Sequence, residues 1–190
     1  MTTLRALPTR LETERLVLRP WREVDATSLR GLWAERDPRA RRRITADGHP
    51  TVAELEEQIR DGLRGTERTG LALLVIEQRE RPGFVGYCGL IVGQASEDEP
   101  ELAYELLRSA HGHGFATEAA RAVVAAADAA GWRRLWATIR EWNAPSRRVA
   151  EKVGFRASGR VDADPERGDS LWYVRDASGG EARCSRRPCS

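Results

Sequence analysis

The sequence predicts an α/β protein, a three-layer α/β/α domain with a mixed, mostly antiparallel sheet. Strand-like apolar runs and helix-like periodic segments mix along the chain, without the strict alternation that marks a parallel sheet. Its 190 residues suit a single domain with a full-sized core. Hydrophobic residues make up 41% and charged residues 32% of the chain, the balance of an ordinary globular protein. We therefore expect one domain over residues 1–175.

The elements of the N-terminal half follow from apolar spacing and from one capping motif. Apolar residues at helical spacing predict a first helix over 25–35. A capping box, in which Thr51 is followed three residues later by Glu54, opens a second helix that we expect to end near Leu63. Strands are expected over 16–20, 71–78, 84–92 and 102–107.

The elements of the C-terminal half are bounded by glycines. An alanine-rich helix is expected over 114–130, ended by Gly131. A shorter helix is expected over 143–153, with Asn143 as its N-cap and Gly154 as its stop. Strands are expected over 135–140, 155–161 and 171–174, and residues 176–190, which lack periodicity, are expected to form a disordered tail.

The most informative segment is the turn that carries Gly112 and Gly114, between an apolar strand and the long helix. A helix start presents free backbone N–H groups and the positive end of the helix dipole, which together bind phosphate. The turn lacks the lysine of a Walker motif, and Thr117 stands where a dinucleotide motif has its third glycine. Two glycines alone also fit an ordinary tight turn.

A second segment, 142–155, lies about 30 residues further on. The two segments together, in this order, resemble the GNAT acyl-CoA N-acyltransferase family: the glycine turn is similar to its pyrophosphate-binding turn, and 142–155 to its Asn-x-x-Ser helix ending in Lys-x-Gly-Phe. Residues 11–21 with 25–26, and also 86–90 and 101–106, are similar to the RimJ/RimL-like branch, which includes enzymes that acetylate the N-terminal amine of ribosomal proteins. The match covers about residues 9–174. In one departure, Ser109 stands where the family often has Gln or Arg, so a side chain that could brace the turn is missing.

The resemblance implies a GNAT-type fold and a single acyl-CoA N-acyltransferase domain over 1–175, with acetyl-CoA as cosubstrate. The pyrophosphate would lie on backbone N–H groups of the glycine turn, and the pantetheine arm would pair with the backbone around Leu106 and Arg108. Asn143 would cap its helix and contact the pantetheine amide, and Arg147 or Arg148 could approach the phosphates. The implied cofactor-binding residues are Leu106, Leu107, Arg108, His111, Gly112, His113, Gly114, Phe115, Ala116, Asn143 and Ser146.

The implied reaction is direct attack of a primary amine on the acetyl thioester. An amine is mostly protonated at neutral pH, so a base must first remove a proton. Glu101 matches an acidic position of the branch, and Glu105 is the alternative because residues i and i+4 of a strand share a face. A backbone N–H of Leu106 or Leu107 would stabilise the oxyanion.

The leaving thiolate needs a proton. Ser146 matches a residue that the branch places near the CoA sulfur, although a serine there also bonds to the helix start. Tyr104 and Tyr173 are further donor candidates, each with packing as the alternative role. His111 and His113 would lie beside the pyrophosphate, so we do not expect them to act as bases.

Charge and cysteine content point away from other classes. A net charge of +2 does not by itself indicate nucleic acid, and the cluster Arg36, Arg39, Arg41, Arg42 and Arg43 fits a solvated surface. Cys88 fits a buried strand, and neither Cys184 nor Cys189 has further ligand residues nearby, so we expect no metal.

The expected partner is an amine acceptor, either a protein N-terminus or a small molecule, and the chain could be a monomer or a homodimer. No apolar run approaches the ~20 residues that span a bilayer, and residues 1–10 lack a signal-peptide core, so we place the protein in the cytoplasm without a membrane partner. Two alternatives stay open: a non-catalytic acyl-CoA-binding or regulatory module on the same fold, and a nucleic-acid-binding protein.

Overall fold

A computed structural model describes residues 5–40, 47 and 50–177 of the chain. Within these residues the helices are α1 (Ala26–Ala34), α2 (Val52–Thr69), α3 (Phe115–Ala130) and α4 (Ala144–Lys152), with short 3-10 turns η1 (Glu23–Asp25), η2 (Pro38–Ala40) and η3 (Arg108–Ala110). The strands are β1 (Leu11–Glu12), β2 (Leu16–Arg19), β3 (Leu73–Gln78), β4 (Phe84–Ile91), β5 (Glu101–Leu106), β6 (Arg134–Arg140), β7 (Arg156–Asp162) and β8 (Ser170–Asp176).

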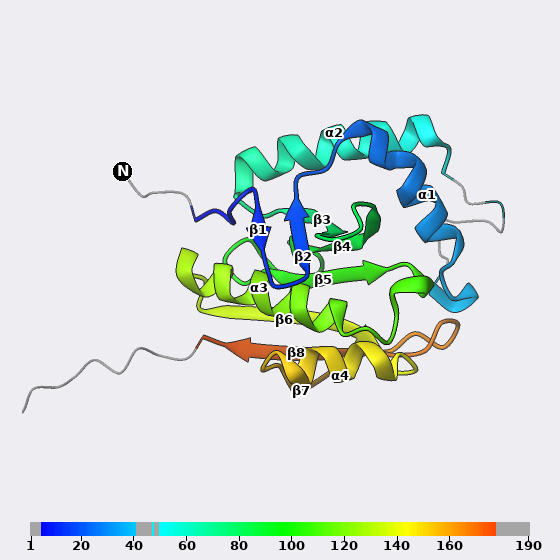
Figure 1. Cartoon of the computed structure of the whole chain (residues 1–190). Helices are drawn as coiled ribbons and strands as arrows, with labels where there is room; N and C mark the ends of the chain where they lie inside the picture. Colours follow the sequence, from blue (N-terminus) through cyan, green and yellow to red (C-terminus); the bar gives the residue numbers. More distant parts are fainter. Residues whose placement is uncertain (1–4, 41–46, 48–49, 178–190) are drawn as a thin grey trace, which may run out of the picture.

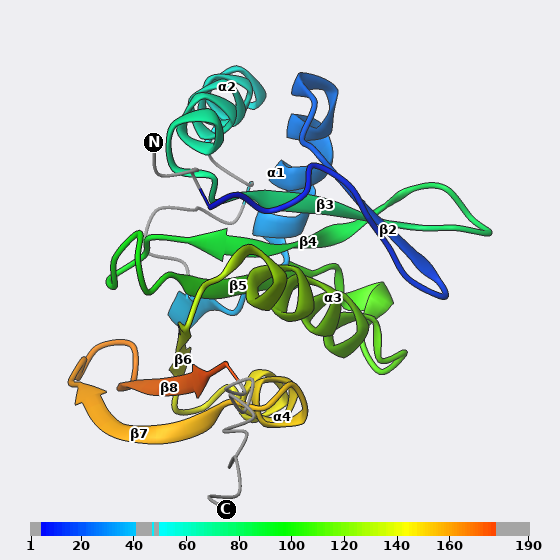
Figure 2. The same ribbon diagram turned by 90° about the vertical axis from the view of Figure 1, so that its left-hand side faces the viewer.

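The strands form one sheet in the order β1-β2-β3-β4-β5-β6-β8-β7. Every neighbouring pair is antiparallel except β5 and β6, which are parallel. Helices α1 and α2 cover one face, and α3 and α4 lie side by side against the other (Figures 1 and 2). This arrangement confirms the predicted three-layer α/β/α domain with a mixed, mostly antiparallel sheet.

Two apolar cores flank the sheet. The larger one lies between the sheet and the α3–α4 layer and includes side chains from every strand from β2 to β6 and from β8. The smaller one lies under α1 and α2 and consists of Ala26, Leu29, Leu32, Leu55 and Ile59. Strand β4 faces both cores, since Val85, Cys88 and Leu90 lie in the larger one and Phe84 and Tyr87 pack against the smaller one.

The predicted elements are all present, with shifted ends. The capping box holds, since Glu54 N–H donates to the Thr51 hydroxyl and Thr51 N–H to the Glu54 carboxylate. The expectation that this helix ends near Leu63 is wrong: α2 continues to Thr69, and Gly70 ends it with a φ of 72°. Its last turns carry polar side chains, so apolar spacing gave no sign of them.

The C-terminal boundary also lies later than expected. Strand β8 includes Asp176, whose carboxylate pairs with Arg134 and Arg156, and Ala177 N–H donates to the Arg133 carbonyl. The rest of the predicted tail, 178–190, lies outside the described residues, as do Cys184 and Cys189.

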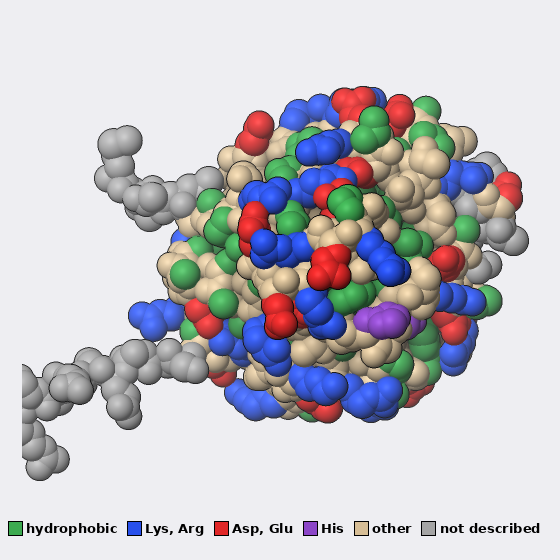
Figure 3. Space-filling model, viewed as in Figure 1, with side chains coloured by type: hydrophobic (Ala, Val, Ile, Leu, Met, Phe, Trp, Pro, Cys, Tyr) green, Lys and Arg blue, Asp and Glu red, His purple; other side chains and the backbone are tan. Residues whose placement is uncertain are grey.

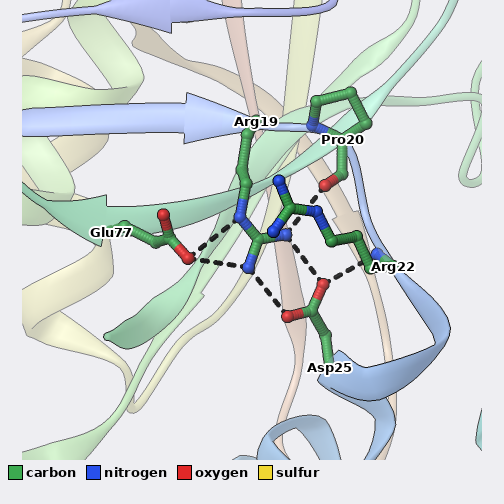
Figure 4. A network of polar contacts seen from close by, with 5 residues as sticks. All are labelled: Arg19, Pro20, Arg22, Asp25 and Glu77. Atoms are coloured by element: carbon green, nitrogen blue, oxygen red, sulfur yellow. Dashed lines mark hydrogen bonds and ion pairs between the residues drawn. The ribbon is translucent and has the colours of Figure 1, made fainter. Parts of the chain in front are cut away.

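A buried ion-pair network joins the sheet to the first helix (Figure 4). Arg19, at the end of β2, donates from Nη1 and Nη2 to the two oxygens of Asp25, both at 2.8 Å, and from Nε to Glu77 at 2.9 Å. Arg19 and Asp25 are each only 6% exposed. Burial alone would raise the pKa of Asp25, but hydrogen bonds from the Arg19 guanidinium and the Arg22 backbone N–H hold it below its usual value. The network fixes where α1 starts relative to β2 and β3.

Candidate active site

The site begins where β5 and β6 part. The two strands are in register at Glu101 and Trp136, near the start of both, and they share no later pair among the described residues. Leu107 N–H donates to Val85 of β4 at 2.9 Å. Because N–H groups alternate in direction along a strand, the N–H of Leu106 points to the opposite edge, toward β6. Two backbone N–H groups were candidates to stabilise the oxyanion. That of Leu106 faces the gap between β5 and β6, and that of Leu107 is already hydrogen-bonded to Val85 of β4.

The glycine turn follows directly on β5. It passes through η3 and then through Gly112 and Gly114, with φ values of 81° and 79°, before α3 begins at Phe115. Both φ values lie in the left-handed region that favours glycine. Helix α3 thus begins after a turn that has no side chain at two positions, and the free N–H groups of a helix start can hold a phosphate.

Both histidines of the turn are exposed, and the histidine surface in Figure 3 lies where α3 starts. His111 Nε2 is 3.0 Å from the Leu106 carbonyl oxygen, and the His113 ring stacks against Phe115 with ring centroids 5.6 Å apart. The Arg108 backbone N–H donates to the Glu35 carboxylate at 2.7 Å. A ligand that pairs with Leu106 and Arg108 therefore has to displace contacts made by His111 and Glu35.

A tyrosine and a serine meet across the gap between β5 and the helix that follows β6. The Tyr104 hydroxyl lies 2.9 Å from both the carbonyl oxygen and Oγ of Ser146. Burial raises the pKa of Tyr104 to about 12, so its hydroxyl keeps its proton at neutral pH. The other tyrosine candidate, Tyr173, is buried in the larger core on β8.

Helix α4 begins as its sequence predicts. The Asn143 side-chain oxygen accepts from Ser146 N–H at 3.1 Å, which leaves its amide nitrogen free of the cap. Arg147 follows Ser146 in the same helix. Its Nε atom is buried and has no hydrogen-bond partner in the described part of the chain. Buried donors in folded proteins are usually hydrogen-bonded, so this nitrogen is a candidate contact for a ligand.

The opposite face of β5 carries the second carboxylate, Glu105. Its oxygens accept from the Tyr87 hydroxyl at 2.7 Å and from Arg36, whose Nε lies 2.6 Å away. Burial, with the Glu105 charge, raises the pKa of Tyr87, so that phenol stays neutral. The Arg36 guanidinium also lies over the Trp33 ring, 4.5 Å from its centroid. The buried indole Nε1 of Trp33 has no partner among the described residues.

Glu101 lies in a different setting. Its side chain is buried at 6% exposure, against Gly93, and accepts a hydrogen bond from Gln94 N–H in the loop between β4 and β5. It sits at the start of β5, at the far end of the strand from the glycine turn. The structure thus brings Ser146 close to Tyr104 and does not bring Glu101 to either.

Several residues around the site carried no signal in the sequence. Glu35, Arg36 and Tyr87 lie 73, 69 and 18 positions from the β5 and turn residues they contact. Arg36 was noted only as part of a basic cluster, and it is paired with Glu105. Arg39 of that cluster lies over the Trp142 ring, 4.3 Å from its centroid, and residues 41–43 lie outside the described part of the chain.

Two absences hold for the described residues. None of their helices combines the length and apolar character needed to cross a bilayer. Nor do three or more His, Cys, Asp or Glu side chains gather there as metal ligands.

The chain matches a known protein family and a known relative. The acetyltransferase (GNAT) domain family matches residues 15–156. YkkB of Bacillus subtilis (strain 168), described as an uncharacterized protein, is 30% identical over 155 residues, which are 80% of this chain and 88% of YkkB.

Solved structures agree. An acetyltransferase from Agrobacterium tumefaciens str. C58 is 27% identical with a TM-score of 0.69, covering 92% of this chain and 97% of its own. RimJ of Mycobacterium smegmatis, solved in complex with CoA-disulfide, is 26% identical with a TM-score of 0.70, covering 85% and 82%. The chain thus belongs to the GNAT acetyltransferase family, and its likeness to RimJ supports the RimJ/RimL-like branch.

Proposed function

We propose that the protein is an acetyl-CoA-dependent N-acetyltransferase that moves the acetyl group onto a primary amine. The observation that carries this proposal is the Tyr104–Ser146 pair beside β5, the strand that leads into the glycine turn at the start of α3. A phosphate cradle and a proton donor on adjoining stretches of chain suit a ligand with a pyrophosphate at one end and a thioester at the other.

The cofactor-binding role is supported by backbone groups rather than by charged side chains. The N–H groups from His111 to Ala116 would hold the pyrophosphate at the positive end of the α3 dipole. The Leu106 N–H would donate to the thioester carbonyl oxygen and stabilise the charge that develops there, a contribution commonly worth about 3 kcal/mol. The free amide of Asn143 would meet the pantetheine arm, and Arg147 would supply its unpaired Nε–H to a phosphate.

For the base, the geometry favours Glu105 over Glu101. A base must reach the amine directly or through one water. Glu101 is three residues from Tyr104 along β5, about 10 Å at the rise of a strand, and it is buried at 6% exposure against the loop before β5. Glu105 adjoins both Tyr104 and Leu106, and its side chain is 23% exposed. We propose that Glu105 accepts the amine proton and that Glu101 holds the loop.

The thiolate would be protonated by Tyr104. The amine nitrogen, once deprotonated, forms a bond to the acetyl carbon, the carbon–sulfur bond breaks, and the departing sulfur takes a proton from the Tyr104 hydroxyl, which Ser146 orients. The nitrogen loses its second proton to the tyrosinate as it becomes the amide, so Tyr104 is neutral again. The high pKa of Tyr104 suits this role, because the hydroxyl stays protonated until the thiolate forms.

The acceptor is proposed as a protein N-terminus or a small-molecule amine, and the proposed setting is the cytoplasm. A peptide N-terminus is supported by the likeness to RimJ of Mycobacterium smegmatis, and a small amine is equally compatible with Glu105. The test is release of CoA thiol from acetyl-CoA in the presence of N-terminal peptides, polyamines and aminoglycosides. Release that depends on one class of amine supports the proposal. Binding of acetyl-CoA without release on any amine would instead favour a non-catalytic acyl-CoA-binding module.

A further inference from the structure

The glycine turn is braced from a distant part of the chain. In the sequence, Ser109 leaves the turn without a local side chain to support it. In the structure, Arg15 reaches it from the connection between β1 and β2, and its Nη1 donates to the His113 carbonyl oxygen at 3.0 Å. The Arg15 guanidinium also lies over the Phe115 ring, 4.9 Å from the ring centroid.

The same arginine is itself locked to the first turn of α3. Arg15 Nε donates to Glu118 at 2.8 Å, and Nη2 lies 2.6 Å from the same oxygen. The other Glu118 oxygen accepts from Arg15 N–H at 2.9 Å and from the Thr13 hydroxyl at 2.6 Å. Burial alone would raise the pKa of Glu118, but these donors hold it below its usual value. The carboxylate is therefore charged and fully engaged at neutral pH.

The contacts of Arg15 with His113 and Glu118, called the Arg15 clamp from here on, fix one peptide plane of the turn. In a trans peptide the C=O and the following N–H point in opposite directions. With the His113 carbonyl drawn toward Arg15, the Gly114 N–H is turned the other way, into the turn. The geometry points to Arg15 as a positioning residue for the acetyl-CoA pyrophosphate, one that aims the backbone donors of the turn through its hold on His113 and Glu118. This inference rests on the proposed function, since it concerns the same cofactor.

The experiment compares binding of two cosubstrates, followed by tryptophan fluorescence. Acetyl-CoA carries the pyrophosphate, and S-acetyl-pantetheine lacks it. We expect Arg15→Gln to weaken acetyl-CoA binding about tenfold, because it removes charge-assisted hydrogen bonds, and to leave S-acetyl-pantetheine unchanged. Arg15→Lys keeps the charge but not the planar fork, so it should also lose affinity for acetyl-CoA. Arg10→Gln is the matched control, because Arg10 pairs with Glu12 on the same hairpin, and within the described residues this is the ion pair that it makes, away from the turn.

Glu118→Gln separates bracing from simple charge. Removing a carboxylate near the phosphates should tighten acetyl-CoA binding if only net charge matters. If the Arg15 clamp positions the turn, binding should weaken, because Arg15 loses its anchor. Arg15 variants that bind acetyl-CoA like the wild type, equal losses for both cosubstrates, or tighter binding by Glu118→Gln would each overturn the inference. A wild-type protein that does not bind acetyl-CoA would overturn the proposed function, and this inference with it.

Discussion

At the scale of single residues, the proposed chemistry depends most on Tyr104. Its hydroxyl is half-buried and bonded to Ser146, and its pKa is raised to about 12. Tyr104→Phe removes the hydroxyl and keeps the ring, so we expect a loss of kcat of about a hundredfold with little change in acetyl-CoA affinity. Steady-state kinetics with the best amine, alongside calorimetric binding, measures both. Tyr173→Phe, in the core on β8, is the matched comparison; a larger kcat loss there than at Tyr104 would contradict the assignment.

The two carboxylates of β5 give a second prediction. Glu105→Gln should lower kcat/KM at neutral pH by about a hundredfold, because the proton acceptor is gone. Glu101→Gln keeps an oxygen that can accept from the Gln94 N–H, so turnover should stay within a few fold. Steady-state kinetics of both variants at neutral pH test this, and the reverse ranking would return the role of base to Glu101.

The buried pair of Arg19 and Asp25 yields a stability prediction. Asp25→Asn should lower the free energy of unfolding by about 3 kcal/mol, because it leaves the buried guanidinium short of one partner. The Asp25 pKa is depressed in the folded state, so its contribution is present above the ordinary value of 3.8 and lost as the pH falls below it. Urea unfolding of wild type and variant should therefore converge toward acid pH.

The control for this pair is an exposed one. Glu23 pairs with Arg60 at the surface, with side chains 55% and 42% exposed. Glu23→Gln should change the free energy of unfolding by less than about 0.5 kcal/mol at any pH. A difference in the free energy of unfolding between wild type and Asp25→Asn that stayed constant from neutral to acid pH would show that the network does not act through the Asp25 charge.

At the scale of elements, the turn between β5 and α3 combines a backbone requirement with a ligand requirement. Gly112→Ala places a Cβ at a φ of 81°, which should cost about 1 kcal/mol of stability, and it adds a methyl group in the proposed phosphate cradle. We expect it to weaken acetyl-CoA binding more than it lowers the thermal midpoint. The exposed helical Gly62 of α2 is the control, because Gly62→Ala should stabilise the fold by about 0.5 kcal/mol and leave binding unchanged. Unaltered binding by Gly112→Ala would count against a phosphate site there.

Local chemistry explains which elements could be predicted from sequence. Helix starts at Thr51 and Asn143 and stops at Gly131 and Gly154 are set by caps a few residues long, so their positions follow from the chain itself. The last turns of α2 are polar and gave no periodic signal. The ends of β5 and β8 depend on pairing with strands far away in the sequence, which no local pattern encodes.

The residues of the candidate site divide in the same way, into those that the sequence predicts and those that it does not. The glycine turn and the Asn143–Ser146 helix start were readable because each is a contiguous motif. The partners that complete them were not. Arg15 and Glu118 are 103 positions apart, and Arg36 and Glu105 are 69 apart. Long-range ion pairs of this kind follow from the fold, and a single sequence does not reveal them.

At the scale of the whole molecule, β5 separates two tasks. Its successive side chains face opposite layers, so Tyr104 packs against the core beneath α3 and α4 while Glu105 bonds Tyr87, which packs against the core beneath α1 and α2. The α3–α4 layer supplies the proposed cofactor site, and the α1–α2 layer lies on the other face of the sheet (Figure 2). Arg36, which follows α1, bonds the proposed base and lies over the Trp33 ring of α1. Cofactor and acceptor would thus approach one strand from opposite sides and meet at Leu106.

The central claim is acetyl transfer from acetyl-CoA to nitrogen at this meeting point. The most direct test is to incubate the full chain with isotopically labelled acetyl-CoA and a panel of N-terminal peptides and small amines, and to read the products by mass spectrometry. We predict a labelled acetyl group on the nitrogen of one amine class, formed by the wild type and strongly reduced in Tyr104→Phe and Glu105→Gln. Absence of labelled product from every amine, in a protein that binds acetyl-CoA, would contradict it.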